Sequence, residues 1–190
     1  MNSAVETKIL DAAFKVIDQY TISGTRMHLI AQECGMAQSN LHYHFKTKKD
    51  LLIALLNYIQ HQFNESRCNA MNQCPNTLRG QLSGFFQQKK YIIQEQPQYD
   101  RVQMDYWSQG QVDSQINESI VQSYQIWREH IVSTILLYDP EQDREQLNLL
   151  AHIMVSMMVG ASVQYLSNSQ AFNLDAYFAA CLDMIENFLS

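Results

Sequence analysis

The sequence predicts an all-α protein of about nine helices, and three observations support that fold class. Apolar residues recur at spacings of three and four along most of the chain, which is the period of an amphipathic helix. No segment alternates apolar and polar residues over the length of a strand. Only 3 prolines and 6 glycines interrupt the 190 residues, so long helices can form.

The first two helices are defined by their ends. Ser3 and Glu6 have the S-x-x-E spacing of a capping box, so the first helix is expected to begin there and to end near Tyr20. Thr25 is expected to cap a short second helix. Gly35 is expected to end that helix, because glycine adopts the left-handed conformation of a C-terminal cap at little cost.

A short third helix is expected over residues 37–45, followed by a longer fourth helix. Thr47 and Asp50 have the spacing of a capping box in which aspartate replaces glutamate. The apolar stripe of the fourth helix reaches Phe63, and it includes Leu51, Leu55, Tyr58 and Ile59.

Five further helices complete the predicted fold. Proline, glycine and polar caps divide the remaining apolar stripes into helices over residues 78–92, 97–109, 116–135, 140–157 and 173–189. Pro140 is expected at the first position of the eighth helix, where a missing N–H costs nothing. Asn173 is expected to cap the ninth.

Charge is distributed unevenly along the chain. The whole chain carries −6, but residues 1–50 hold 6 basic and 5 acidic residues, whereas residues 51–190 hold 7 and 14. Lys46, Lys48 and Lys49 cluster at the predicted start of the fourth helix, in a stretch without acidic residues. Cations there oppose the helix macrodipole, so the cluster indicates an external anion, such as a phosphate backbone.

The two short helices joined through Gly35 fit a helix-turn-helix, in which the second helix enters the DNA major groove. Hydrogen-bonding side chains follow one another on that second helix, namely Gln38, Ser39, Asn40, His42 and Tyr43. Asparagine and glutamine can bond the edge of adenine with two hydrogen bonds. A solvated polar face between core helices would have the same pattern, so periodicity and charge alone leave both interpretations open.

The same region resembles a known family. It is similar to the N-terminal domain of the tetracycline-repressor-like (TetR) transcriptional regulators in residues 9–13 (ILDAA), 30–31 (IA), 41–45 (LHYHF) and 46–51 (KTKKDL). The resemblance covers about residues 5–63. It implies a homodimer in which residues 1–47 form a helix-turn-helix domain that binds a palindromic double-stranded DNA operator. It also implies that residues 48–190 dimerise and bind a small-molecule effector that releases the DNA.

The resemblance implies DNA contacts from the second helix, the recognition helix and the start of the fourth helix. These residues are Arg26, Met27, His28, Gln38, Ser39, Asn40, His42, Tyr43, His44, Lys46 and Lys48. Three positions depart from the family pattern. Ala37 stands where a serine commonly caps the recognition helix, His42 stands where tyrosine is usual, and Met27 offers no hydrogen bond. An operator sequence therefore cannot be inherited from the family.

Aromatic and methionine side chains are frequent in the C-terminal two-thirds of the chain. Tyrosine and tryptophan often line small-molecule cavities, because each joins an apolar body to a polar group. Aromatic stripes at helical spacing are also ordinary core. With the resemblance, this pattern predicts an effector pocket lined by His61, Phe86, Met104, Tyr106, Trp107, Tyr124, Trp127 and Met158.

The last two helices are apolar around more than one face, which requires burial on more than one side. In a chain of this length, that pattern predicts a subunit interface, and Ser156 and Gly160 would let two helices approach closely. The expected interface residues are Met157, Gly160, Ala161, Tyr165, Phe178 and Leu182. Ordinary core packing is the alternative.

The sequence gives little support to other functions. The longest apolar stretch, residues 153–163, is too short to span a bilayer, and the N-terminus lacks the features of a signal peptide, so a cytoplasmic protein without a membrane partner is expected. Neither a cofactor nor a metal is expected, because His42 and His44 point to different sides of a helix.

We therefore expect a ligand-responsive DNA-binding regulator, most simply a repressor, and not an enzyme. No G-x-S-x-G, GxGxxG or P-loop motif occurs. A helical small-molecule-binding module without DNA binding is the alternative, and a helical enzyme is a third possibility that no motif supports.

Overall fold

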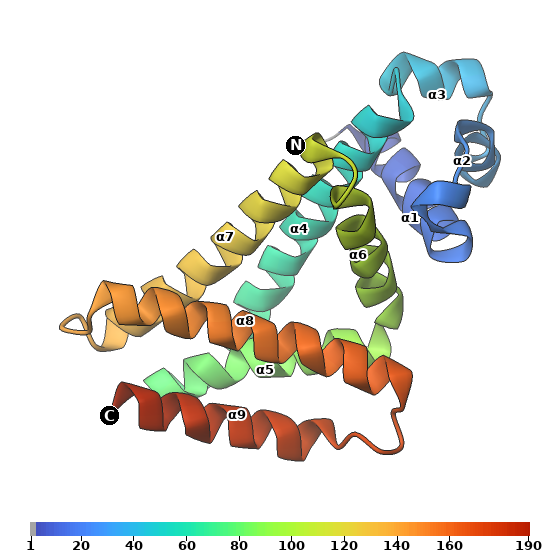
Figure 1. Ribbon diagram of the computed structural model, residues 1–190. Coiled ribbons are helices and arrows are strands. Elements are labelled where there is room, and N and C mark those ends of the chain that lie inside the picture. Colours follow the sequence, from blue (N-terminus) through green and yellow to red (C-terminus); the bar gives the residue numbers. More distant parts are fainter. Residues whose placement is uncertain (1–2) are drawn as a thin grey trace. The chain divides into compact units, whose positions relative to one another are not determined.

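The computed structural model describes residues 3–190, and over those residues it confirms the all-α fold with nine helices and no strand (Figure 1). The helices are α1 Ala4–Gly24, α2 Met27–Cys34, α3 Gln38–His44, α4 Lys48–Asn72, α5 Leu78–Glu95, α6 Pro97–Gly110, α7 Ser114–Tyr138, α8 Arg144–Ser167 and α9 Leu174–Leu189.

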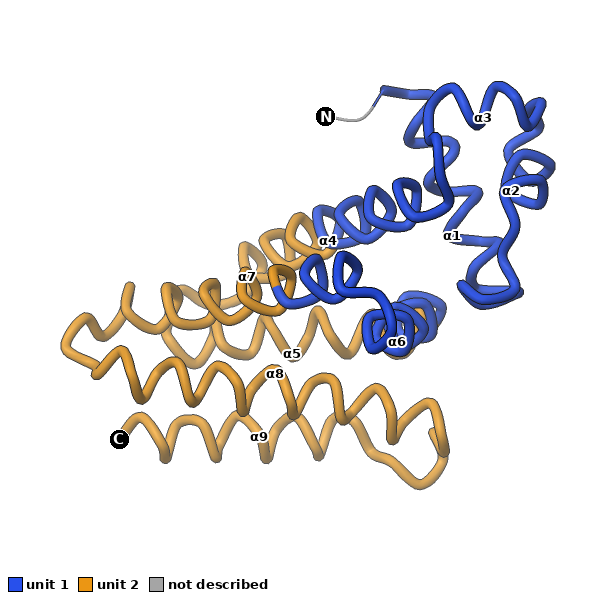
Figure 2. The backbone as a smooth tube through the Cα atoms, turned by 45° about the horizontal axis from the view of Figure 1, so that its top comes forward, with its two compact units in different colours: residues 1–62, 98–121 blue, residues 63–97, 122–190 orange. Residues whose placement is uncertain are grey.

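The chain forms two compact units, which Figure 2 shows in different colours. Unit 1 comprises residues 1–62 and 98–121, and unit 2 comprises residues 63–97 and 122–190. Both α4 and α7 contribute residues to each unit. The sequence predicts a different division, at residue 47, between a DNA-binding domain and a ligand-binding and dimerisation domain. That division concerns function, whereas the two units are defined by compactness. It stays a prediction.

Helix α1 begins as predicted, and its regular part ends at Tyr20 as predicted, because Thr21 has a non-helical φ of 59° and ψ of 168°. A short last turn beyond this kink extends the element to Gly24. The capping box of α1 is present, because the Ser3 hydroxyl accepts from the Glu6 N–H at 3.2 Å and the Ser3 N–H donates to the Glu6 carboxylate at 3.0 Å. The expectation that Thr25 caps α2 is wrong. Its backbone N–H and its hydroxyl both donate to the Thr21 carbonyl, so Thr25 closes α1, while Arg26 stands at the start of α2 without a capping side chain.

The turn and the next helix start follow the sequence pattern. Gly35 ends α2 with a φ of 69°, a left-handed conformation that favours glycine. At the start of α4, the Thr47 N–H donates to the Asp50 carboxylate at 3.0 Å, and the Asp50 N–H donates to the Thr47 hydroxyl at 3.1 Å. The predicted capping box is therefore confirmed.

One helix start in unit 2 was predicted wrongly and another correctly. Pro140 lies in a turn, and α8 begins at Arg144 because the Asp143 side chain accepts from the Glu145 N–H. An aspartate cap three residues later therefore replaces the expected proline start. Asn173 caps α9 as predicted, accepting from the Ala176 N–H at 3.1 Å.

Each unit has its own buried apolar core. In unit 1, the predicted stripes of α1 and α4 meet the short helices, and the fully covered side chains include Ile9, Leu10, Ile17, Ile30, Leu41, Leu51 and Leu55. In unit 2, the core joins α5, α7, α8 and α9, and it includes Phe85, Ile131, Leu147, Met154, Met158 and Ile185.

Helix α8 is long and apolar enough to cross a membrane by length and composition alone, and 39% of an apolar 18-residue stretch within it is buried. The sequence-based expectation considered only its uninterrupted apolar stretch and missed this. The buried residues of α8 belong to the core of unit 2, and core helices of water-soluble proteins have the same composition.

Candidate nucleic-acid interface and interior cation site

Helix α3 presents a polar face to solvent while a single apolar side chain anchors it. Gln38, Ser39 and Asn40 are exposed, and the Tyr43 side chain is 75% exposed. Leu41 is fully buried in the core of unit 1. The predicted recognition residues therefore lie on the outside of a helix that one leucine holds in place, and they have the chemistry that reads base edges.

Side chains order the surface of α3. The His42 ring lies between the Gln38 amide, at 3.4 Å from Nε2 to Nε2, and the Lys46 carbonyl, at 3.3 Å from His42 Nδ1. The Lys46 ammonium lies 5.8 Å from the centre of the Tyr43 ring. His44 meets the same ring edge-on at 5.4 Å. These contacts hold the polar groups in a preferred orientation before any ligand binds.

The three residues predicted at the start of α2 differ in their availability. Arg26 is exposed, and its Nη1 donates to the carbonyls of Ser23 at 2.7 Å and Thr25 at 3.1 Å. His28 is exposed, whereas Met27 is half-buried. Arg26 and His28 can reach an external phosphate, and Met27 can offer only apolar contact.

The three lysines near the start of α4 have different partners. The Lys48 ammonium donates to the carbonyls of Ile22 at 2.5 Å and Thr25 at 2.8 Å, at the C-terminal end of α1. Burial, together with repulsion by Arg26, lowers the pKa of Lys48. Lys49 forms an ion pair with Asp113 at 2.7 Å. Two backbone carbonyls at the end of α1 thus satisfy Lys48 within the protein.

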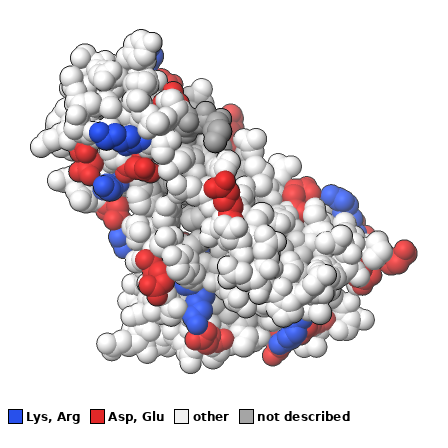
Figure 3. All heavy atoms as spheres, turned by 180° about the vertical axis from the view of Figure 1, so that it is seen from behind, with Lys and Arg blue, Asp and Glu red and all other residues white. Residues whose placement is uncertain are grey.

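Lys46 remains available for an external anion. Within residues 3–190 it has no acidic partner, and its side chain is exposed. The face of the molecule in Figure 3 carries scattered charges on a mostly uncharged surface. Lys46 is therefore the lysine in this cluster that best fits the predicted phosphate contact.

Hydrogen bonds join helix α6 to α1 and α4 within unit 1. Arg101 forms two hydrogen bonds with the Asp18 carboxylate, at 2.8 and 2.9 Å, and the Tyr106 hydroxyl donates to the Leu52 carbonyl at 2.7 Å. The Ile22 N–H donates to the Asp105 carboxylate. A movement of α6 would therefore be transmitted to the C-terminal end of α1.

An open groove of about 490 Å³ lies beside these contacts. Its lining residues come from α1, α4 and the first turn of α6, and include Asp11, Asp18, Tyr58 and Tyr99. Tyr58 donates to Asp11 at 3.0 Å, and burial, with this bond, raises the pKa of Tyr58 to about 12. None of the predicted effector residues lines this groove.

The eight predicted effector residues divide equally between the units. His61, Met104, Tyr106 and Trp107 belong to unit 1, and Phe86, Tyr124, Trp127 and Met158 belong to unit 2. Trp107 is 58% exposed, and the Tyr106 hydroxyl is already bonded. In unit 2, Tyr124 and Trp127 stack with ring centres 6.4 Å apart. All four residues of unit 2 lie in or against its apolar core, and Tyr124 and Trp127 are in direct ring contact. The effector pocket stays a prediction.

Sequence reasoning missed Arg67, which is buried in unit 2 with only 4% of its surface exposed. Its guanidinium carbon lies 5.1 Å from the centre of the Trp127 ring and 5.8 Å from that of Phe85. Its Nη1 donates to the Asn64 side chain at 3.2 Å. A signal was present, because the apolar stripe of α4 continues past Phe63 in steps of four and places Arg67 on it.

Two buried hydrogen-bond donors at Arg67 have no partner among residues 3–190. These are Nε of Arg67 and Nε1 of the neighbouring Trp127. Burial lowers the pKa of Arg67 to about 10, and burial, then the charge of Arg67, lowers the pKa of His130. His130 packs edge-on against Phe85 at 5.3 Å. At neutral pH the site therefore holds one cation and a neutral imidazole.

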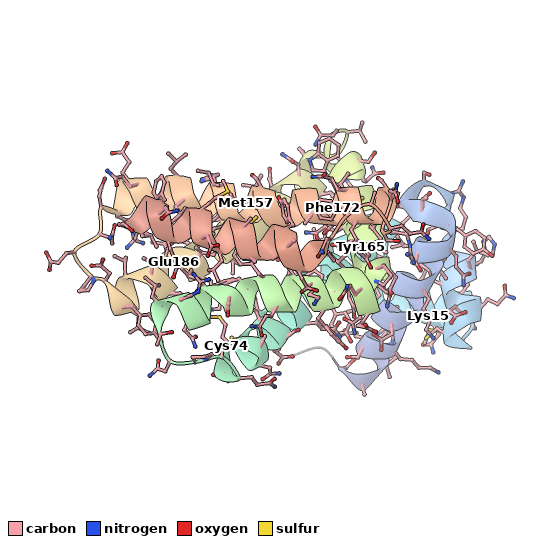
Figure 4. All side chains as sticks on the ribbon, turned by 90° about the horizontal axis from the view of Figure 1, so that it is seen from below. Lys15, Cys74, Met157, Tyr165, Phe172 and Glu186 are labelled. Atoms are coloured by element: carbon pink, nitrogen blue, oxygen red, sulfur yellow. The ribbon has the colours of Figure 1, made fainter. Side chains whose placement is uncertain are left out.

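The predicted dimer residues lie on α8 and α9, where Figure 4 labels Met157 and Tyr165. Met157, Gly160 and Tyr165 are half-buried, whereas Ala161, Phe178 and Leu182 are buried within the chain. A side chain added at Gly160 would meet nothing within 4 Å. The exposed apolar residues of the two helices are Leu149, Val163, Met184 and Phe188.

The N-terminal residues match a known family. Residues 9–55 fit the family described as bacterial regulatory proteins, tetR family. The HTH-type transcriptional regulator RutR of Escherichia coli K12 is 40% identical over 57 residues, which are 30% of this chain and 27% of RutR. The chain thus spans about a quarter of the length of this relative.

Solved structures share the fold over nearly the whole chain. A transcriptional regulator from Saccharomonospora viridis in complex with choline has a TM-score of 0.82 and 22% identity, and the match covers 97% of each chain. FadR from Bacillus subtilis in complex with stearoyl-CoA has a TM-score of 0.79 and 17% identity, over 94% of this chain and 96% of FadR. At these identities the similarity concerns the fold.

Proposed function

The chain carries the N-terminal domain of the tetR family of bacterial regulatory proteins, and we propose that it is a cytoplasmic, homodimeric repressor that a small molecule releases from a palindromic DNA operator. The observation that carries this proposal is the outward polar face of α3, anchored by buried Leu41, within the residues that match the family. A helix with exposed amide side chains can read base edges in the major groove.

Dimerisation would supply the affinity that one domain lacks. Unit 1 has few free cations, so a single domain would make few phosphate contacts and bind DNA weakly. In a two-fold dimer, two α3 helices about 34–36 Å apart would contact two half-sites in successive major grooves. The half-buried and exposed apolar residues of α8 and α9, from Leu149 to Phe188, are the surface that we assign to this dimer.

Gly160 provides a test of that surface. Gly160→Leu should fold normally, because open space surrounds the position within one chain, but should prevent two α8 helices from approaching closely. Sedimentation analysis should then report a monomer. Gln125→Leu, on an exposed position of α7, is the matched control and should remain dimeric. A Gly160→Leu protein that stays dimeric would remove α8 from the interface.

Release of DNA requires an effector that binds one dimer conformation more tightly than another. The fold neighbours were solved with choline and with stearoyl-CoA, which supports a ligand site in this fold without identifying the ligand of this chain. The stacked pair of Tyr124 and Trp127 in unit 2 is the part of the predicted pocket that we favour.

Selection of binding sites from random duplex DNA tests the proposal. The wild-type chain should enrich a palindrome, and Gln38→Ala should change the preferred base at one position of each half-site. Gln19→Ala, an exposed glutamine on α1, should enrich the wild-type palindrome. Failure to enrich any sequence at low salt would instead favour the alternative, a helical ligand-binding module that does not use DNA.

A further inference from the structure

We infer that unit 2 contains a binding site for an organic anion, with the Arg67 guanidinium and the Trp127 indole N–H as the groups that hold it. The inference rests on the proposed effector function and adds the chemical class of the effector. Such a ligand carries a carboxylate or a phosphate on an apolar body.

The guanidinium of Arg67 is a buried cation. Arg67 is 4% exposed; it donates a hydrogen bond to the Asn64 side chain and lies over the rings of Phe85 and Trp127. Within residues 3–190, no carboxylate forms an ion pair with it. A buried charge without a counter-ion is costly, so a protein keeps one where a function requires it.

Two hydrogen-bond donors at this cation are unused within residues 3–190. Arg67 Nε and Trp127 Nε1 are both buried without a partner. Nε–H and one Nη–H of a guanidinium form the pair of parallel donors that a carboxylate or phosphate accepts. Because both unused groups are donors, the missing partner must be an acceptor, which excludes an ammonium ligand.

The surroundings of the guanidinium indicate an apolar body for the rest of the ligand. The groups around the guanidinium are aromatic, and the neighbouring side chains of unit 2 form its apolar core. An anion with an aliphatic or aromatic body would cover these faces, whereas a small inorganic ion would leave them uncovered. Choline, which is bound in one fold neighbour, is a cation and would be repelled here.

The test uses the full chain and a matched set of C8 probes: octanoate, octyl phosphate, octan-1-ol and octylammonium, together with inorganic phosphate. Calorimetry should show binding of octanoate or octyl phosphate, weaker binding of octan-1-ol, and none of octylammonium. Inorganic phosphate should bind weakly. The comparison of octanoate with octyl phosphate distinguishes the two sources of negative charge.

Two variants then assign the binding to these donors. Arg67→Met keeps an apolar side chain of similar length and should weaken binding of the preferred anion by about 10- to 100-fold, with little change for octan-1-ol. Trp127→Phe keeps a smaller aromatic ring and removes the N–H, and it should weaken anion binding by about 3- to 10-fold. Arg79→Met, at an exposed arginine of α5 that pairs with Asp183, is the control.

Thermal unfolding without ligand separates a binding role from a structural one. If Arg67 awaits a ligand, Arg67→Met should leave Tm unchanged or higher, because it removes a buried charge without a counter-ion. A clear fall in Tm, together with unchanged anion binding, would make Arg67 a structural residue and overturn the inference. If Arg67→Met fails to fold, unchanged anion binding by Trp127→Phe overturns it.

Operator binding by the same preparations distinguishes the two proposals. If the wild-type chain binds its operator but none of the anions, or binds octylammonium as tightly as octanoate, the anion site is wrong and the regulator stands. If it binds the anions through Arg67 but binds no DNA, the anion site stands and the regulator is wrong.

Discussion

Helix α4 carries one buried or half-buried cation in each compact unit, and their surroundings differ. In unit 1, the Lys48 ammonium donates to two backbone carbonyls at the end of α1. In unit 2, the Arg67 guanidinium has a single hydrogen bond, to Asn64, and a buried Nε–H without an acceptor. One cation is satisfied by its own chain, and the other is left with an unused donor.

The difference shows that burial alone does not identify a ligand site. Both cations have a lowered pKa, mainly because burial disfavours their charged forms. The balance of donors and acceptors separates them, because a satisfied cation stabilises the fold and an unsatisfied one does not. Removal of the satisfied cation in unit 1 should therefore lower the stability of the fold. Removal of the unsatisfied cation in unit 2 should instead change the electrostatics around it.

The largest expected effect is on the anchor of α3. Leu41→Ala removes a fully buried side chain and should destabilise unit 1 by about 2–5 kcal/mol. Because the polar face of α3 is held by this side chain, operator binding should fall sharply. Chemical denaturation followed by circular dichroism measures the loss. Ser39→Ala, at an exposed position of the same helix, should leave stability unchanged, and equal stability of both variants would contradict the anchoring role.

Removal of Lys48 should have the second largest effect, with a sign opposite to that expected for Arg67. Lys48→Met would remove the Lys48 donor from the Ile22 carbonyl and leave the Thr25 carbonyl with Arg26 Nη1 as its side-chain donor, which costs about 1–2 kcal/mol. Chemical denaturation of the ligand-free chain measures this cost. Lys46→Met is the control, since the exposed Lys46 has no such bonds. A Lys48→Met protein as stable as wild type would show that Lys48 does not stabilise the fold, and so would contradict the proposed difference between the two cations.

A smaller effect should come from Lys46, an exposed cation of unit 1. Lys46→Ala should lower the slope of log K against log salt for operator binding by about 1 per contact, and it should weaken binding to all sequences alike. Fluorescence anisotropy titrations between low and physiological salt measure the slope. Lys15→Ala, at a lysine paired with Glu33 on the surface of unit 1, should leave it unchanged. A sequence-dependent loss would assign Lys46 to base reading.

The sequence predicted features whose partners are close along the chain. The capping boxes of Ser3 with Glu6 and of Thr47 with Asp50 are contained within four residues, and both formed as expected. The expectation for Thr25 was wrong because its hydroxyl can form a hydrogen bond with the helix before it or with the helix after it. Both partners lie within a few residues along the chain, so the sequence does not decide between them. The nine helices could therefore be predicted, but two of their starts could not.

The interior site depends on packing that periodicity does not report. Arg67 could have been noticed as a charge on the apolar stripe of α4, but Phe85 and Trp127 come from α5 and α7. Only tertiary structure shows that both rings flank the guanidinium. Likewise, the sequence suggested that Lys48 requires an external anion. The structure shows that two carbonyls at the end of α1 accept hydrogen bonds from it.

The smallest expected effect is electrostatic and concerns His130. Burial, and then the charge of Arg67, holds the pKa of His130 below its ordinary value of 6.5. As pH falls below about 6.5, the unfolded chain takes up a proton that folded His130 resists. The free energy of unfolding therefore decreases from pH 6.5 down to the pKa of folded His130, and it is unaffected above pH 6.5.

In Arg67→Met the repulsion disappears while burial remains, so the pKa of His130 should rise part of the way and the loss of stability in acid should become smaller. An NMR titration of the His130 ring measures this, with Arg79→Met as the control that should titrate as wild type does. An unchanged titration in Arg67→Met would mean that burial alone sets the pKa, and that the guanidinium charge is neutralised within the folded chain.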